Sequence, residues 1–104
     1  EAWRHQLFNN EADQLVVTRV LSGKPARGIR NRYITELEAL DEPMLPYPLQ
    51  YSLSGVLRAR AQAQNNPDFL AMWSGQGIGL LQETTIEALM TDLVTGARRL
   101  ISEL

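Results

Sequence analysis

Two tyrosines stand four residues apart, at the expected entrance to a helix. Tyr47 and Tyr51 lie in the segment Tyr-Pro-Leu-Gln-Tyr, and one helical turn would place both phenols on the same side. A phenol hydroxyl can donate a hydrogen bond to an oxyanion that develops during a reaction. Two amphipathic rings that pack at a domain edge with solvated hydroxyls would give the same pattern. Residue chemistry alone favours this second, structural interpretation.

A glycine-rich segment, Ser74-Gly75-Gln76-Gly77-Ile78-Gly79, is the second candidate for chemistry. Alternating glycines allow a backbone to come close to a flat ring or a phosphate. The segment does not match a dinucleotide-binding fingerprint, because a helix is expected before it and the glycine spacing differs. A flexible connection between two helices is an equally good interpretation.

A run of basic residues without an intervening acid precedes a run of acidic residues. The basic residues are Arg19, Lys24, Arg27, Arg30 and Arg32, and the acidic ones are Glu36, Glu38, Asp41 and Glu42. The basic run could bind a phosphate, a carboxylate or RNA, but no aromatic residues interleave with it as single-strand binding would favour. The balance of charge predicts a solvated face with surface salt bridges.

The composition excludes several classes of function. A chain of 104 residues suffices for one small domain, and its 44% hydrophobic content argues against disorder. A net charge of -2 gives no general attraction for nucleic acid or anionic lipid. With no cysteine and one histidine, no metal site is expected. That histidine, His5, falls on the exposed side of the first expected helix and is interpreted as a surface residue.

No apolar run approaches the length of about 18 residues that a membrane helix requires. The opening Glu1-Ala2-Trp3 is neither a methionine start nor a signal peptide. It begins inside an expected helix, so we interpret the chain as a fragment of a soluble, cytoplasmic protein.

The hydrophobic pattern and the turn signals predict a mostly helical chain with one short β-hairpin. The expected helices cover residues 2–12, 31–40, 50–64 and 68–73 and a last one from residue 84, and the expected strands cover residues 15–21 and 26–29. Residues 43–48 hold three prolines and should form an extended connector.

Side-chain patterns give these helices their ends and faces. Asn31 and Asn66 are predicted N-caps, with Pro67 in a first helical position, and Thr84 with Glu87 is predicted to form a capping box. The expected apolar faces are Tyr33, Leu37 and Leu40 in one helix, Leu53, Val56, Leu57 and Ala61 in the next, and Ile86, Leu89, Met90, Leu93, Val94, Ala97 and Ile101 in the last.

Three ordered segments together resemble one known family. Residues 16–32 (Val-Val-Thr-Arg-Val-Leu-Ser-Gly-Lys-Pro-Ala-Arg-Gly-Ile-Arg-Asn-Arg), residues 46–50 (Pro-Tyr-Pro-Leu-Gln) and residues 73–77 (Trp-Ser-Gly-Gln-Gly) are similar to motifs of the nitronate monooxygenases, formerly called 2-nitropropane dioxygenases. The leading Glu-Ala-Trp of residues 1–3 fits the same family. The resemblance covers nearly the whole chain.

The resemblance implies a two-part enzyme, with a TIM-type barrel that binds FMN and a smaller helical domain that covers the active site. Residues 1–13 would leave the barrel, residues 14–83 would form the lid domain, and residues 84–104 would be the closing helix. A complete barrel takes about 250 residues. The phosphate-binding loops and the catalytic histidine would therefore lie upstream, and no catalytic residue is expected in this chain.

In the full-length enzyme, the resemblance implies oxidation of alkyl nitronates by FMN and dioxygen to carbonyl compounds and nitrite. Tyr47 and Tyr51 would bind the substrate, and Gly55 stands where the family has a lysine. An anionic nitronate would then need another cation, such as Arg58. The cofactor-binding residues would be Ser74, Gly75, Gln76 and Gly77. The fragment alone should be inactive and should bind no FMN.

Two other functions remain open at this point. Related FMN barrels include NADH:quinone reductases and enoyl-thioester reductases, and the missing lysine is compatible with either. A stand-alone helical module that pairs with a partner, or with itself as a homo-oligomer, would use the same amphipathic helices.

Overall fold

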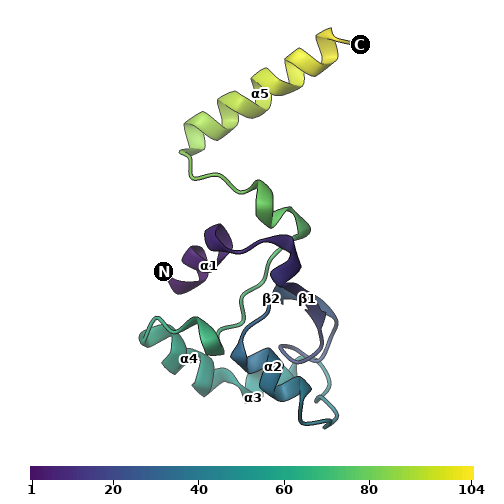
Figure 1. The fold of residues 1–104 in the computed structure, drawn as a ribbon, viewed down its shortest axis with the longest axis vertical. Coiled ribbons are helices and arrows are strands. Elements are labelled where there is room, and N and C mark those ends of the chain that lie inside the picture. The colour runs from purple at the N-terminus through teal and green to yellow at the C-terminus, as the bar shows by residue number, and fades with distance from the viewer.

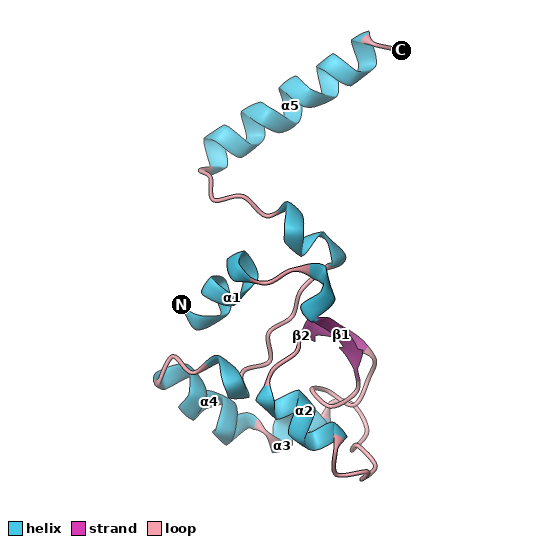
Figure 2. Cartoon of the chain, viewed as in Figure 1, coloured by secondary structure: helices cyan, strands magenta, loops and turns pink.

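The computed structural model describes all residues from 1 to 104 and confirms a mostly helical chain with one antiparallel hairpin (Figures 1 and 2). The helices are α1 (Ala2–Asn9), α2 (Arg32–Glu38), α3 (Leu49–Leu53), α4 (Gly55–Ala63) and α5 (Ile86–Ser102), and the strands are β1 (Leu15–Thr18) and β2 (Ala26–Ile29). Short 3-10 turns occupy Ala12–Gln14, Pro67–Phe69 and Gln76–Leu80. None of the helices is long and apolar enough to span a bilayer.

The hairpin forms as predicted, but its first strand is shorter. β1 pairs with β2 from Leu15↔Ile29 to Thr18↔Ala26, and the chain then turns. The Val20 N–H donates to Thr18 Oγ1 at 3.2 Å, which draws the backbone out of the strand. Because Val20 and Leu21 are buried in the turn itself, these two residues belong to the core instead of the sheet.

The main core lies between this turn and α2. Val20, Leu21, Tyr33 and Ile34 form one buried cluster. Asn31 caps α2 as predicted, since its side chain accepts a hydrogen bond from the Ile34 N–H at 3.2 Å. The predicted apolar face of this helix is wrong at Leu40, which lies beyond the end of α2 and is exposed.

The predicted helix over residues 50–64 is broken into α3 and α4 at Ser54, whose φ and ψ are -86° and 4°. The expected apolar stripe is confirmed only at Ala61, because Leu53, Val56 and Leu57 are exposed. The buried positions are Gln50, Ser54 and Ala61. The inner face is therefore largely polar, and hydrogen bonds to backbone carbonyls satisfy it.

The predicted helix over residues 68–73 is wrong. Asn66 does cap a turn, accepting from the Asp68 N–H at 3.0 Å, but that turn ends at Phe69. The chain then extends along β2, where the Ile29 N–H donates to the Met72 carbonyl at 2.8 Å and the Ser74 N–H donates to the Arg27 carbonyl at 3.2 Å. Pairing with a distant strand overrides the local helical preference.

Gly28 makes this close pairing possible. A Cβ at residue 28 would lie 2.8 Å from the Met72 carbonyl oxygen, well inside ordinary contact. Met72 is thereby held against Ile29 and Ile78 in a second buried cluster.

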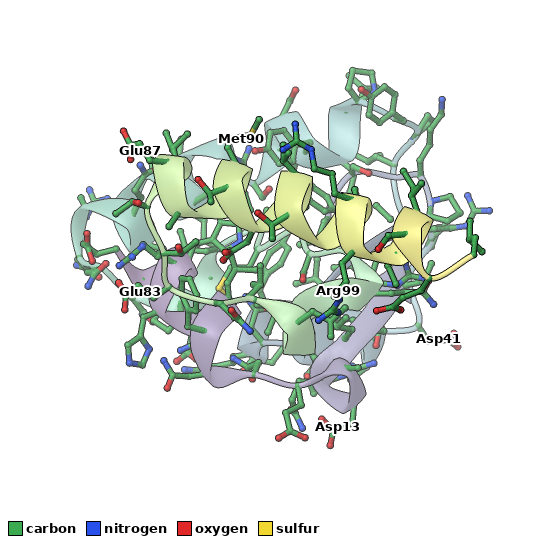
Figure 3. All side chains as sticks on the ribbon, turned by 90° about the horizontal axis from the view of Figure 1, so that it is seen from above. Asp13, Asp41, Glu83, Glu87, Met90 and Arg99 are labelled. Carbon is green, nitrogen blue, oxygen red and sulfur yellow. The ribbon has the colours of Figure 1, made fainter.

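Helix α5 stands away from the rest of the molecule (Figure 1), and none of its residues is buried. Its N-cap is Thr85, whose hydroxyl accepts from the Ala88 N–H at 3.2 Å, so the capping residue predicted at Thr84 is one position too early. Figure 3 looks along the long axis with α5 nearest the viewer, and side chains such as Met90 and Arg99 project from it. The predicted apolar face exists but is uncovered.

Candidate functional site

The three family-like segments, far apart in sequence, pack into one unit. The turn after β1 lies against residues 45–47, and Gly23 is the contact point. Gly23 has a φ of 93°, and a Cβ there would collide with the Leu45 carbonyl oxygen and lie 2.7 Å from the Tyr47 nitrogen. The third segment joins through Trp73, which bridges to Gly28 of β2.

Gln50 fastens the first two segments together. Its Oε1 accepts from the Leu45 N–H at 3.0 Å, and its Nε2 donates to the Val20 carbonyl at 3.1 Å. The side chain is buried, so the bond to Val20 is shielded from water and the bond to Leu45 is partly shielded. The last residue of the Pro-Tyr-Pro-Leu-Gln segment is therefore structural.

Tyr47 and Tyr51, the two predicted substrate-binding residues, lie in different environments. Tyr47 precedes α3, is 56% exposed, and has the Lys24 ammonium 4.8 Å from its ring centre. Tyr51 lies within α3, half-buried, with its ring centre 6.4 Å from that of Trp73. The two phenols do not share a helical turn, and their rings are not in contact. Only Tyr51 faces one of the cavities described below.

Arg58 is the functional candidate that the tyrosine spacing does not reveal. Its guanidinium carbon lies 3.4 Å from the Tyr51 ring centre, an arrangement typical of a cation–π contact. Gly55, the position at which the resemblance leads one to expect a lysine, lies beside it, since a Cβ on Gly55 would be 4.0 Å from Arg58 Nη2. The i, i+7 relation of Tyr51 and Arg58 is the sequence signal that could have indicated the pair.

Tyr51 and Arg58 line a cavity of about 250 Å³. Helix α1 supplies part of its opposite wall, with Trp3 donating from Nε1 to the Trp73 carbonyl at 3.1 Å. The lining residues are Glu1, Ala2, Trp3, Tyr51, Arg58, Gln62, Asn65, Leu70 and Ala71.

The predicted glycine-rich segment lines a separate cavity of about 360 Å³. Its lining residues are Leu7, Trp73, Ser74, Gly75, Gly77, Ile78 and Leu81. Gln76, the fourth predicted cofactor residue, does not line it. No atom lies within 4 Å of a Cβ built on Gly75, so the backbone there is open to close approach by another group.

The predicted surface salt bridges are confirmed at two of the arginines. Arg32 Nε lies 2.5 Å from Glu36 Oε1, and Arg30 Nη1 lies 2.9 Å from Glu38 Oε2. Burial of Glu38 raises the pKa of its carboxyl, but hydrogen bonds from Arg30 and Thr18 and the charge of Arg30 together lower that pKa below its ordinary value. No cluster of three or more potential metal ligands is found.

The lowered pKa of Glu38 gives a pH-dependent contribution to stability. This contribution is present above the ordinary carboxyl pKa and is lost as the pH falls through the lower pKa of the folded state. At about pH 7 we expect Glu38→Gln to reduce the free energy of unfolding by less than about 1 kcal/mol, because the pair is partly exposed. Urea denaturation should show this difference vanishing near about pH 2. A difference that persists unchanged in acid would contradict the assignment.

The largest depression, about 720 Å³, contains none of the predicted site residues. It lies between β1 and residues 41–44, and its charged lining residues are Arg19, Glu38, Asp41 and Glu42. This mixture of signs offers no selectivity for one kind of ion.

A family model described as nitronate monooxygenase matches residues 1–96. Over 102 residues the chain is 32% identical to a probable nitronate monooxygenase of Staphylococcus saprophyticus, covering 98% of this chain and 29% of that protein. Over 98 residues it is 37% identical to a nitronate monooxygenase of Pseudomonas aeruginosa, covering 93% of this chain and 28% of that protein. The chain thus spans less than a third of the length of either relative.

A solved structure of a nitroalkane oxidase from Streptomyces ansochromogenes shares the fold. The match covers 99% of this chain and 29% of that chain, with a TM-score of 0.84 and 24% sequence identity. At this identity the likeness concerns the fold alone, and it extends to the arrangement of the hairpin and helices described above.

Proposed function

Because the chain belongs to the nitronate monooxygenase family, we propose that it is the lid domain and closing helix of a flavin-dependent enzyme that oxidises alkyl nitronates. The observation that carries this proposal is the match of the family model to residues 1–96. Its packing supports it too, since the three family-like segments form one unit that fixes Trp73 beside Tyr51.

The uncovered apolar face of α5 supports the division into lid and barrel. Its large apolar side chains are between 45% and 78% exposed; they are Ile86, Leu89, Met90, Leu93, Val94, Leu100 and Ile101. A continuous apolar surface on a helix marks an interface. The relatives are more than three times as long as this chain, so we propose that the rest of the barrel covers this face.

FMN would supply the redox chemistry that passes electrons from the nitronate toward dioxygen. The residues of this chain that fit a flat cofactor are Ser74, Gly75 and Gly77, because they line one cavity and the glycines leave the backbone uncovered. For Gln76, a role in cofactor binding is proposed from the family motif alone. The phosphate-binding loops and the catalytic base are proposed to lie in the barrel.

On the substrate side, the residues of this chain would bind and orient the nitronate. The Tyr51 ring contacts the Arg58 guanidinium and lies near the Trp73 ring, so its hydroxyl could donate to a substrate oxygen from a fixed position. Trp73 and Trp3 would limit the access of water. Tyr47 is proposed to reach the substrate only where the barrel closes over its exposed ring.

The test compares two reactions of the complete enzyme. Purified protein should release nitrite and consume dioxygen when given propionate 3-nitronate, and it should oxidise NADH with a quinone at a much lower rate. Rapid NADH oxidation without nitrite release would replace the proposal with the reductase alternative, with which the glycine at position 55 is compatible. Stoichiometric FMN on the isolated 104-residue chain would contradict the division into lid and barrel.

A further inference from the structure

Arg58 is a half-buried cation whose position is set by its neighbours on the same helices. The break at Ser54 separates α3 from α4 and turns the Tyr51 carbonyl toward side-chain donors. Ser54 Oγ donates to this carbonyl at 3.2 Å, and Arg58 Nη2 donates to it at 2.8 Å. Arg58 Nε also donates to Ser54 Oγ at 3.2 Å. With its face on the Tyr51 ring, the guanidinium is fixed in both position and tilt.

The same guanidinium keeps unused hydrogen-bonding capacity. An arginine carries five N–H donors, and only Nε and Nη2 donate within the chain. Nη1 makes no hydrogen bond, and no carboxylate forms an ion pair with Arg58. By contrast, Arg4, Arg30 and Arg32 pair with Glu83, Glu38 and Glu36. A cation with free donors at the wall of a cavity is suited to binding an anion from outside the chain.

The cavity beside Arg58 suits a small anion with an apolar tail. Ala2, Trp3, Leu70 and Ala71 give it apolar walls, and its volume of about 250 Å³ is several times that of one water molecule. The one acidic residue among its lining is Glu1, which is exposed and does not pair with Arg58.

We propose that Arg58 binds the two-oxygen anionic head group of the substrate, with the alkyl tail lying against Trp3 and Leu70. This inference rests on the proposed function, because it takes the head group to be a nitronate. A nitronate, like a carboxylate, is planar with two oxygens that share the negative charge, and a guanidinium binds such a group through two parallel hydrogen bonds. Arg58 is thus a determinant of specificity for anionic substrates.

Binding of an unreactive carboxylate tests the site without turnover. Titration calorimetry on the complete enzyme should show that Arg58→Gln raises the Kd for propionate on the order of 10- to 100-fold, because a hydrogen-bonded charge pair is lost. Propionamide, which has the same shape but no charge, should bind equally to both proteins. Arg60→Gln is the matched control, since Arg60 is exposed on the same helix and does not line the cavity.

The other outcomes of the propionate titration also decide whether Arg58 binds the anion. A propionate Kd that is the same in Arg58→Gln and Arg60→Gln, or an equal loss of propionate and propionamide binding, would overturn the inference. If Arg58→Gln does not fold, Arg58→Lys carries the test, because it keeps the charge but loses the planar fork. A rise of about tenfold in its propionate Kd supports the site, and an unchanged Kd overturns it.

Measuring nitrite release alongside propionate binding distinguishes a failure of this inference from a failure of the proposed function. Propionate binding that depends on Arg58, in an enzyme that releases no nitrite from any nitronate, would leave the anion site standing and remove the nitronate. Nitrite release whose KM is the same in wild type and Arg58→Gln would keep the proposed function and remove Arg58 from substrate binding.

Discussion

Replacing Gly23 with alanine is expected to lower the free energy of unfolding by about 3 kcal/mol. Two effects add at this residue. The φ of 93° belongs to a region that residues with a side chain rarely adopt. The new methyl group would also meet the backbone of Leu45, Pro46 and Tyr47, which cannot turn aside as a side chain could. The hairpin turn and the proline-rich connector would have to move apart.

Urea denaturation of wild type and variant measures this loss directly. Gly79→Ala is the matched control, because a Cβ at residue 79 meets no atom within 4 Å and its φ is not in the left-handed region. We expect the control to change the free energy of unfolding by less than about 1 kcal/mol. If the two variants were equally stable, the close packing of the turn against the connector would be refuted.

The second large effect is expected at Gln50. Gln50→Met keeps the length of the side chain but removes both of its hydrogen bonds, so the buried Val20 carbonyl loses its side-chain donor. An unsatisfied buried polar group costs about 1–3 kcal/mol. With the loss of the bond to the Leu45 N–H as well, we expect a total reduction of about 3 kcal/mol in the free energy of unfolding.

The variant Gln50→Glu tests the two hydrogen bonds of Gln50 separately. A glutamate keeps an acceptor for the Leu45 N–H but offers no donor to the Val20 carbonyl when ionised. It should therefore be destabilising at neutral pH and less so in acid, where the protonated carboxyl can donate again. Gln82→Met, in the exposed segment before α5, is the control. Equal stability of Gln50→Met and Gln82→Met would show that the two hydrogen bonds of Gln50 contribute little to stability.

Features whose causes lie within a few residues could be predicted from the sequence. Asn31 and Asn66 act as caps in the structure, because a short amide satisfies the free N–H groups of the turn that follows it. The hairpin formed across Ser22-Gly23-Lys24-Pro25 for a similar local reason. The mostly helical fold class followed from these elements and from the resemblance together.

Features that depend on distant partners could not be predicted. Residues 70–74 contain good helix formers, but the Met72 carbonyl and the Ser74 N–H pair with β2 instead. The buried polar residue of α3, Gln50, bonds to Val20, thirty positions earlier. Periodicity alone assigns the apolar side of an isolated helix to the core, and here that side of α4 is exposed.

The geometry of the candidate site could not be predicted from the sequence either. The spacing of Tyr47 and Tyr51 suggested a pair on one turn, but α3 begins only at Leu49. Tyr51 and Arg58 are seven residues apart, and their contact spans the break at Ser54, which the residue type at that position does not indicate. The resemblance pointed to the right region, whereas the geometry of Arg58 is visible only in the structure.

The connector between α2 and α3 constrains how the length of this chain can vary. Residues 41–46 form no helix or strand, and such segments normally accept insertions and deletions. Here the backbone at Leu45 is pressed against Gly23 and bonded to Gln50, so an added residue would shift the carbonyl and amide that those two residues meet. Variation in length should therefore be concentrated at exposed segments such as residues 81–85, while the connector keeps a constant number of residues.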